Sequence, residues 1–220
     1  MKENLVVGLT GGIACGKTTV AEIFKKFGAE VIDTDSLGHQ LLKSDPSIRE
    51  KLVSAFGNGI LDGRGEIDRS KLGRLVFDNP DCLRILNEII HPPIIELTNA
   101  EIKRKLSSGK NEVVVIDAAL LIELNLMYMV DSVVLVCADE DTQVRRLIQR
   151  GLSQEDAQKR IRSQMPSHEK ARFADFIIYT DGSMSDTIKQ AEQVWKALTC
   201  RIDRAGNDFW QRREGAEKKT

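Results

Sequence analysis

Five short apolar runs, two of which end at an aspartate, predict β-strands. They cover residues 5–9, 30–33, 112–117, 132–137 and 176–179. The runs at 5–9, 112–117 and 132–137 are rich in Val, Ile and Leu, which is typical of strands buried on both faces. Because segments with helical spacing separate the runs, the pattern predicts an α/β fold with a doubly wound, parallel, five-stranded sheet flanked by helices.

Helix-start signals in the middle of the chain predict a helical region between the second and third strands. Asp45 and Asn79 each stand before a proline, which combines an N-cap side chain with proline at the first helical position. The expected helices cover 46–56, 69–77, 80–91 and 94–107. Pro92 and Pro93 follow His91 directly, so we expect them to end one helix and separate it from the next.

The remaining pattern predicts a single domain over residues 1–200. Its core would consist of 1–35 and 110–200, with a helical insertion at 36–109. Other expected helices cover 18–27, 142–150, 154–164 and 184–198, with a capping box at 153–156. The charged segment 201–220 is expected to be a flexible tail.

The composition of the chain argues against several classes of protein. The 220 residues include 32 Lys and Arg against 33 Asp and Glu, so no overall basic field favours nucleic acid or an anionic membrane as a partner. The four cysteines form no CxxC pair, which argues against a zinc ribbon and a secreted disulfide scaffold and favours the cytoplasm. No apolar stretch approaches the roughly 20 residues of a membrane helix.

A phosphate-binding loop follows the first strand. Gly11, Gly16, Lys17 and Thr18 have the Walker A spacing G-x-x-x-x-G-K-[ST]. Backbone amides of such a loop wrap the phosphates of a nucleotide at a helix N-terminus. Lys17 would meet the β and γ phosphates, and the Thr18 hydroxyl would bind Mg²⁺. The expected ATP-binding residues are Gly11, Gly12, Ile13, Ala14, Cys15, Gly16, Lys17 and Thr18.

Aspartates at strand ends supply the candidate carboxylates. Asp33 lies at the carboxyl end of the second strand, where it could orient an acceptor hydroxyl and take its proton. The plainer alternative is that Asp33 and Asp35 cap the following helix. Asp117 ends the third strand and resembles a Walker B aspartate that holds Mg²⁺, with a simple turn residue as its alternative.

Arginines concentrate at 145–165, which we interpret as a lid. Arg146 and Arg150 share a helical face and could converge on the transferred phosphate. A salt-bridged, solvent-facing surface is the alternative for any one of them. A thiol at Cys15, beside the helix N-terminus, could have a lowered pKa and be sensitive to oxidation, but the favoured interpretation is a small residue tolerated at a loop position.

Seven segments together resemble the dephospho-coenzyme A kinase family. They are GLTGGIACGKT, VIDTD, EIIHPPI, DAALLIE, QVRRLIQRGLS, RIRSQMP and TDGS. The resemblance implies transfer of the γ-phosphoryl of ATP to the ribose 3′-hydroxyl of dephospho-CoA. It implies Asp33 as the base, a lid around Arg146 and Arg150, and an acceptor side formed by the insertion, with the residues Asp35, His91 and Leu121.

Some positions depart from the family pattern, and other functions stay open. The loop carries Ala14 and Cys15 in place of the usual residues, and Ala14 implies a backbone conformation that does not require glycine. Tyr179 and Thr180 replace the common Asp and Asn. A nucleoside monophosphate or shikimate kinase is one alternative. A GTPase-like switch is the other, although no guanine-reading Asn-Lys-x-Asp motif occurs.

Overall fold

The computed structural model describes residues 4–77, 79–107 and 113–202. The chain forms two compact units: Met1–Ile32 together with Ile102–Thr220, and Asp33–Glu101. The second unit begins three residues before the insertion expected at 36–109 and ends eight residues before its expected end. Most of the expected tail, from residue 203 onward, lies outside the described residues.

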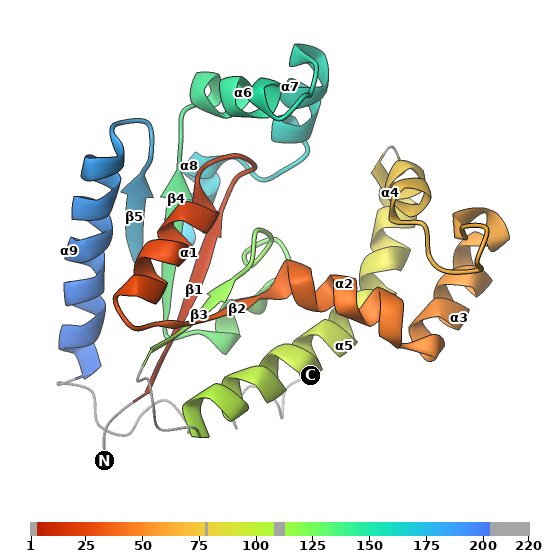
Figure 1. The fold of residues 1–220 in the computed structure, drawn as a ribbon, viewed down its shortest axis with the longest axis horizontal. Helices are drawn as coiled ribbons and strands as arrows, with labels where there is room; N and C mark the ends of the chain where they lie inside the picture. The colour runs from red at the N-terminus through yellow and green to blue at the C-terminus, as the bar shows by residue number, and fades with distance from the viewer. Residues whose placement is uncertain (1–3, 78, 108–112, 203–220) are drawn as a thin grey trace. The chain divides into compact units, whose positions relative to one another are not determined.

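A five-stranded sheet organises the first unit, as the apolar runs predicted (Figure 1). Its strands are β1 (Leu5–Gly11), β2 (Glu30–Asp33), β3 (Val113–Asp117), β4 (Ser132–Cys137) and β5 (Phe176–Tyr179), in the order β2-β3-β1-β4-β5. β1 pairs in parallel with both β3 and β4, with Leu9 opposite Asp117. The central β1 therefore ends beside the carboxyl ends of its two neighbours.

Helices surround this sheet (Figure 1). They are α1 (Lys17–Lys26), α6 (Glu140–Gln149), α7 (Gln154–Arg162), α8 (Ser167–Lys170) and α9 (Met184–Ile202), with short 3₁₀ turns η2 (Leu126–Met129) and η3 (Ala171–Phe173). α6 begins two residues before the predicted start because Asp139 caps it, accepting a hydrogen bond from the Thr142 amide at 2.6 Å. α9 runs four residues beyond the predicted end, into the segment expected to be tail.

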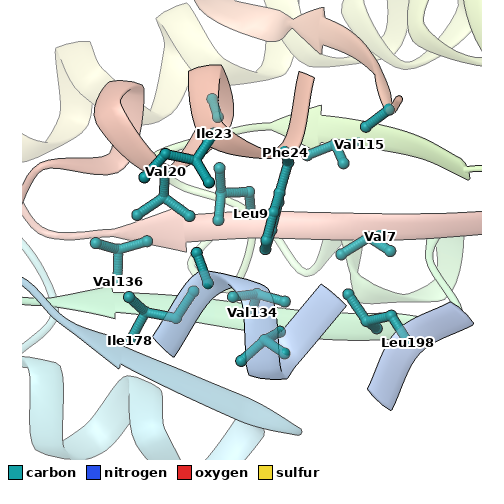
Figure 2. Packing of buried hydrophobic residues seen from close by; sticks show 14 of the residues in the cluster. Val7, Leu9, Val20, Ile23, Phe24, Val115, Val134, Val136, Ile178 and Leu198 are labelled. Carbon is teal, nitrogen blue, oxygen red and sulfur yellow. The ribbon is translucent and has the colours of Figure 1, made fainter. Parts of the chain in front are cut away.

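The main core lies between the sheet and the helices α1 and α9 (Figure 2). Its members are fully or almost fully buried and come from all of these elements; they include Val7, Leu9, Val20, Phe24, Val115, Val134, Val136, Ile178 and Leu198. Burying such side chains stabilises the fold by about 1.5–3 kcal/mol each. This packing fixes β1 and α1, and so fixes both ends of the loop between them.

The second unit is helical and has a separate small core. It contains α2 (Thr34–Ser44), α3 (Pro46–Phe56), η1 (Asn58–Ile60), α4 (Arg69–Phe77) and most of α5 (Pro80–Ser107). The predicted caps are confirmed: Asp45 accepts from the Ser47 amide at 2.9 Å and Asn79 from the Asp81 amide at 3.0 Å. Leu41, Ile48, Leu52, Ile60, Leu72 and Val76 form the core of this unit.

The expected helix break at Pro92 and Pro93 is wrong. Both prolines lie inside the continuous helix α5. A proline inside a helix removes one hydrogen bond and crowds the preceding turn, which costs about 3 kcal/mol or more. Apolar side chains on both sides of the prolines, Leu86 and Ile89 before them and Ile94 and Leu97 after them, pack against the same core. This shared packing outweighs the local cost.

Candidate phosphate-binding site

The backbone of the loop between β1 and α1 is curled by two residues with positive φ. Ala14 has φ 58° and Gly16, which precedes α1, has φ 88°. The expectation for Ala14 is therefore wrong, since the residue takes a left-handed conformation that favours glycine. A backbone in which residues with positive φ alternate with residues with negative φ turns successive backbone amides toward one side, and these amides form a concave site for anions. The predicted phosphate loop thus has the backbone its function needs.

Lys17 and Asp117 meet at the base of the loop. Lys17 begins α1 and Asp117 ends β3, and the Lys17 ammonium forms an ion pair with the Asp117 carboxylate. Both side chains are largely buried, with 14% of Lys17 and 9% of Asp117 exposed. Burial strengthens the attraction between the charges, so the pair holds the lysine at the phosphate site. Asp117, the predicted Mg²⁺ ligand, therefore lies beside the lysine of the loop.

Thr180 and Arg146 bind the outer side of the loop. The buried Thr180 hydroxyl donates to the Cys15 carbonyl at 2.7 Å. The Arg146 guanidinium donates to the Ala14 carbonyl at 3.0 Å and to the Thr180 carbonyl at 2.7 Å. Because a peptide plane is rigid, fixing the Cys15 carbonyl outward aims the Gly16 amide the other way. In this structure Arg146 binds the loop itself.

Removing the Thr180 hydroxyl is expected to weaken ATP binding about 10-fold. Thr180→Val keeps the shape of the side chain but leaves the Cys15 carbonyl without its donor, a loss of about 1–1.5 kcal/mol. Thr180→Ser retains the hydroxyl and is the matched control. Titration with a fluorescent ATP analogue measures both variants, and equal affinities for the two would show that the hydroxyl does not support the loop.

The two helices of the expected lid, α6 and α7, pack against each other and over the loop. Leu147 and Ala157 are buried with Ala14, and Ile13 packs against the same cluster. Arg150, by contrast, caps the end of α6 and is exposed, and its guanidinium makes no hydrogen bond or ion pair in the described part of the chain. The expected convergence of Arg146 and Arg150 is therefore not present in this conformation.

Two glutamines line a cavity beside the loop. Gln164, just after α7, accepts a hydrogen bond from the Ile13 amide at 2.7 Å. Gln143, on α6, is buried close to Gly12. The cavity has a volume of about 250 Å³, and Glu140 and His168 also line it. Gln164 thus occupies the Ile13 amide of the loop in this structure.

Cys15 does not have the lowered pKa that its position suggested. Only 1% of the residue is exposed, and burial raises the pKa of its thiol to about 11, against smaller opposing effects of the Lys17 amide and charge. Desolvation of the thiolate outweighs the helix N-terminus. The hypothesis of an oxidation-sensitive loop cysteine is therefore wrong, and the favoured interpretation of Cys15 as a small residue tolerated in the loop agrees with this burial.

This placement makes Cys15 inert to alkylation. Because the pKa of about 11 keeps the thiol protonated at neutral pH, iodoacetamide at pH 7.5 is expected to modify the exposed Cys200 and to leave Cys15 unmodified. Peptide mass spectrometry over time reads out both sites. Modification of Cys15 at a rate similar to Cys200 would contradict the buried placement.

Three of the residues expected to serve the acceptor lie in the second unit, which covers most of the expected insertion. They are Asp33, Asp35 and His91. Asp33 is exposed and caps α2, accepting from the Ser36 amide at 3.1 Å and from the Ser36 hydroxyl at 2.7 Å. Leu121 is fully buried and packs against Gly8, so it is a core residue here and not the acceptor contact that the resemblance implied.

His91 introduces a pH dependence of stability. Partial burial holds the pKa of His91 below its ordinary value of 6.5. Below pH 6.5 the unfolded chain then binds more protons than the folded one, so the free energy of unfolding falls as the pH drops through this window. Urea unfolding at pH 7.5 and 5.0 should show a smaller loss for His91→Gln than for the unsubstituted protein; equal losses would contradict this.

Oxygen donors suited to Mg²⁺ are present at the loop. The Thr18 hydroxyl lies at the exposed start of α1, and the Asp117 carboxylate lies at the end of β3. Mg²⁺ prefers such hard oxygen ligands and keeps several of its waters, so one or two protein ligands suffice. The residues therefore fit the metal that the loop motif implies.

The parallel sheet and the Walker A loop between β1 and α1 define a P-loop protein. A family model described as dephospho-CoA kinase matches residues 5–186. The chain belongs to the dephospho-CoA kinase family. This membership agrees with the resemblance seen in the seven segments, and it replaces the alternatives of a different kinase family or a GTPase-like switch.

Individual relatives support the assignment over most of their length. The chain is 39% identical to a dephospho-CoA kinase of Aquifex aeolicus, covering 88% of this chain and 97% of the relative. It is 39% identical to one of Arabidopsis thaliana, covering 96% and 90%. The solved dephospho-CoA kinase from Campylobacter jejuni superimposes with a TM-score of 0.64 at 29% identity, covering 88% of this chain and 96% of that one.

A second solved structure is similar as well. The crystal structure of TT1252 from Thermus thermophilus matches with a TM-score of 0.76 and 31% identity, over 89% of this chain and 98% of that chain.

Within the described residues, none of the helices combines the length and the apolar character that crossing a membrane requires.

Proposed function

We propose that this chain transfers the γ-phosphoryl group of ATP to the ribose 3′-hydroxyl of dephospho-CoA, giving coenzyme A and ADP. The observation that carries the proposal is the curled loop with Lys17 held against Asp117, in a chain that belongs to this family. Such a transfer needs little covalent chemistry from the protein. It needs positioned phosphates and neutralised charge.

The loop supplies the donor side of the reaction. Its amides bind the phosphates of ATP, and the Lys17 ammonium neutralises charge that grows on the transferred group. On binding, the nucleotide takes the Ile13 amide from Gln164 and competes with Asp117 for Lys17. Arg146 supports the reaction by holding the Ala14 carbonyl.

Asp33 serves the acceptor side. Its carboxylate is exposed at the end of β2, which leaves it accessible to a substrate hydroxyl. In the proposed reaction, the 3′-hydroxyl proton passes to an Asp33 oxygen as the hydroxyl oxygen bonds to the γ-phosphorus and the bond to the ADP oxygen breaks. Asp35 and His91 are proposed to contact the acceptor from the same unit.

Mg²⁺ is the proposed metal, held by Thr18 and Asp117 together with the phosphates. When bound, it would neutralise part of the negative charge on the phosphates of ATP. We place the reaction in the cytoplasm, a choice that the four free cysteines support.

An acceptor panel tests this function. The protein is incubated with MgATP and one of dephospho-CoA, AMP, CMP, shikimate or no acceptor, and ADP release is followed by a coupled assay. Turnover with dephospho-CoA alone is expected. Equal or greater turnover with AMP, CMP or shikimate would contradict the proposed acceptor and retain only the kinase class.

A further inference from the structure

Lys170 is a fully buried cation that the proposed reaction does not use. It ends α8, and none of the residue is exposed. Burying an ammonium group is expensive unless partners compensate its charge and its three N–H donors. The groups that contact the Lys170 ammonium therefore indicate which part of the structure this buried charge stabilises.

Those partners lie in the segment that follows Asp117. The Lys170 ammonium donates to the Ala119 carbonyl at 3.0 Å and lies 2.8 Å from a carboxylate oxygen of Glu123. The Glu123 side chain is 19% exposed, but both of its oxygens are enclosed and receive no well-formed hydrogen bond within the described residues. Lys170 is thus the group that compensates the charge of Glu123.

The same segment is attached to the strand that delivers the phosphate loop. The buried Thr10 hydroxyl, on β1, donates to the Ala119 carbonyl at 3.1 Å, and the Ala118 amide donates to the Leu9 carbonyl at 3.0 Å. The Ala119 carbonyl therefore joins β1, the segment after β3 and α8. Asp117, two residues before Ala119, is the partner of Lys17.

We propose that Lys170 is a positioning residue for phosphoryl transfer, which fixes the segment 117–123 through Ala119 and Glu123 and so holds Asp117 at Lys17. Three parts of the chain that are far apart in sequence, β1, the segment 117–123 and α8, meet at the Ala119 carbonyl. The hydrogen bond and the ion pair of the Lys170 ammonium both go to the segment 117–123. The inference rests on the kinase function proposed above.

Replacing the ion pair by apolar side chains separates positioning from stability. Exchange of a buried ion pair for apolar groups of similar volume is often neutral for folding, whereas removing one partner leaves a buried charge. We therefore use the double variant Lys170→Met/Glu123→Leu. Lys105→Met/Glu30→Leu is the matched control, because it removes a partly buried ion pair (2.6 Å) at the amino-terminal end of β2.

A readout that does not need activity is the acylation of Lys17. Acetic anhydride labelling, measured by peptide mass spectrometry and normalised to the exposed Lys25, reports how firmly Asp117 holds the lysine. We expect Lys17 to react at least about 3-fold faster in the Lys170→Met/Glu123→Leu protein and at the original rate in the control. An unchanged rate in a folded double variant would overturn the proposal.

Kinetics supply the second readout. With dephospho-CoA and MgATP, kcat of the double variant is expected to fall about 10- to 100-fold, as for a displaced catalytic group, with KM for ATP within about 3-fold. In an Asp117→Asn background the same double change should have no further effect on kcat. A kcat within twofold of the unsubstituted enzyme, or a fully additive loss in that background, would overturn the proposal.

Thr10→Val provides an independent route if the double variant does not fold. It removes one hydrogen bond to the Ala119 carbonyl with almost no change of shape, so it should show the same direction of change in Lys17 labelling at a smaller size. No change in labelling would overturn the proposal. Absence of turnover in the unsubstituted enzyme would refute the proposed function alone, because the labelling result does not depend on activity.

Discussion

Replacing Lys17 by methionine is expected to lower kcat about 10³-fold, the equivalent of about 4 kcal/mol of transition-state stabilisation. Lys17 is held by Asp117 at the base of the curled loop, so its charge is already placed where the transferred phosphoryl group gains negative charge. Methionine keeps the length and apolar character of the stem and loses only the ammonium. The effect should therefore appear in kcat more than in folding.

Lys25→Met is the matched control for this prediction. Lys25 lies on the same helix, α1, but its side chain is 62% exposed, and among the described residues its one ion pair is with Glu22, at 3.7 Å. We expect kcat of this variant to match the unsubstituted enzyme, since an exposed ion pair contributes little. Steady-state kinetics at saturating substrates measure both. A Lys17→Met enzyme that retains a tenth of the original kcat would contradict the role assigned to the ammonium.

Asp33→Asn is expected to lower kcat about 10²-fold or more with unchanged ATP binding. Asparagine caps a helix as well as aspartate does, so the cap that Asp33 provides to α2 should survive the substitution. What the variant loses is the ability to accept the proton of the acceptor hydroxyl. The substitution therefore separates catalysis from the plainer role in capping.

The cap of the neighbouring helix offers the control. Asp45 accepts hydrogen bonds from the first turn of α3 as Asp33 does from the first turn of α2. Asp45→Asn should leave kcat within about twofold of the original value, because only a cap is involved. If Asp33→Asn and Asp45→Asn gave equally small effects, the base would have to be another group.

Much of the fold follows from local patterns in the sequence. The strands could be predicted because β-branched runs long enough to be buried strands are separated by helical segments. The loop could be predicted because glycine, lysine and threonine at fixed spacing serve a single backbone arrangement. The caps at Asp45 and Asn79 follow from a side chain that bonds amides two or three residues away. All of these signals lie within a short stretch of chain.

The supports of the site could not be predicted because they depend on contacts between distant segments. Thr180 meets Cys15 across 165 positions, Gln164 meets Ile13 across 151, and Lys170 meets Ala119 across 51. A lysine in a charged stretch gives no local sign that it will be buried.

Two of the interpretations drawn from the sequence, one for Cys15 and one for Pro92 and Pro93, are wrong for related reasons. For Cys15, the local argument considered the helix N-terminus and could not include desolvation by side chains from other elements. For Pro92 and Pro93, the local cost was correct, but packing by residues on both sides of the prolines outweighed it. In both cases tertiary burial decided the outcome.

The position of the new phosphate on the product tests the central claim most directly. The enzyme is incubated with MgATP and dephospho-CoA, and the product is examined by ³¹P NMR and tandem mass spectrometry. The account predicts one added phosphate, as a monoester on the ribose 3′-oxygen, with one ADP formed for each product molecule. A phosphate on any other oxygen, or ADP formed without a phosphorylated product, would contradict it.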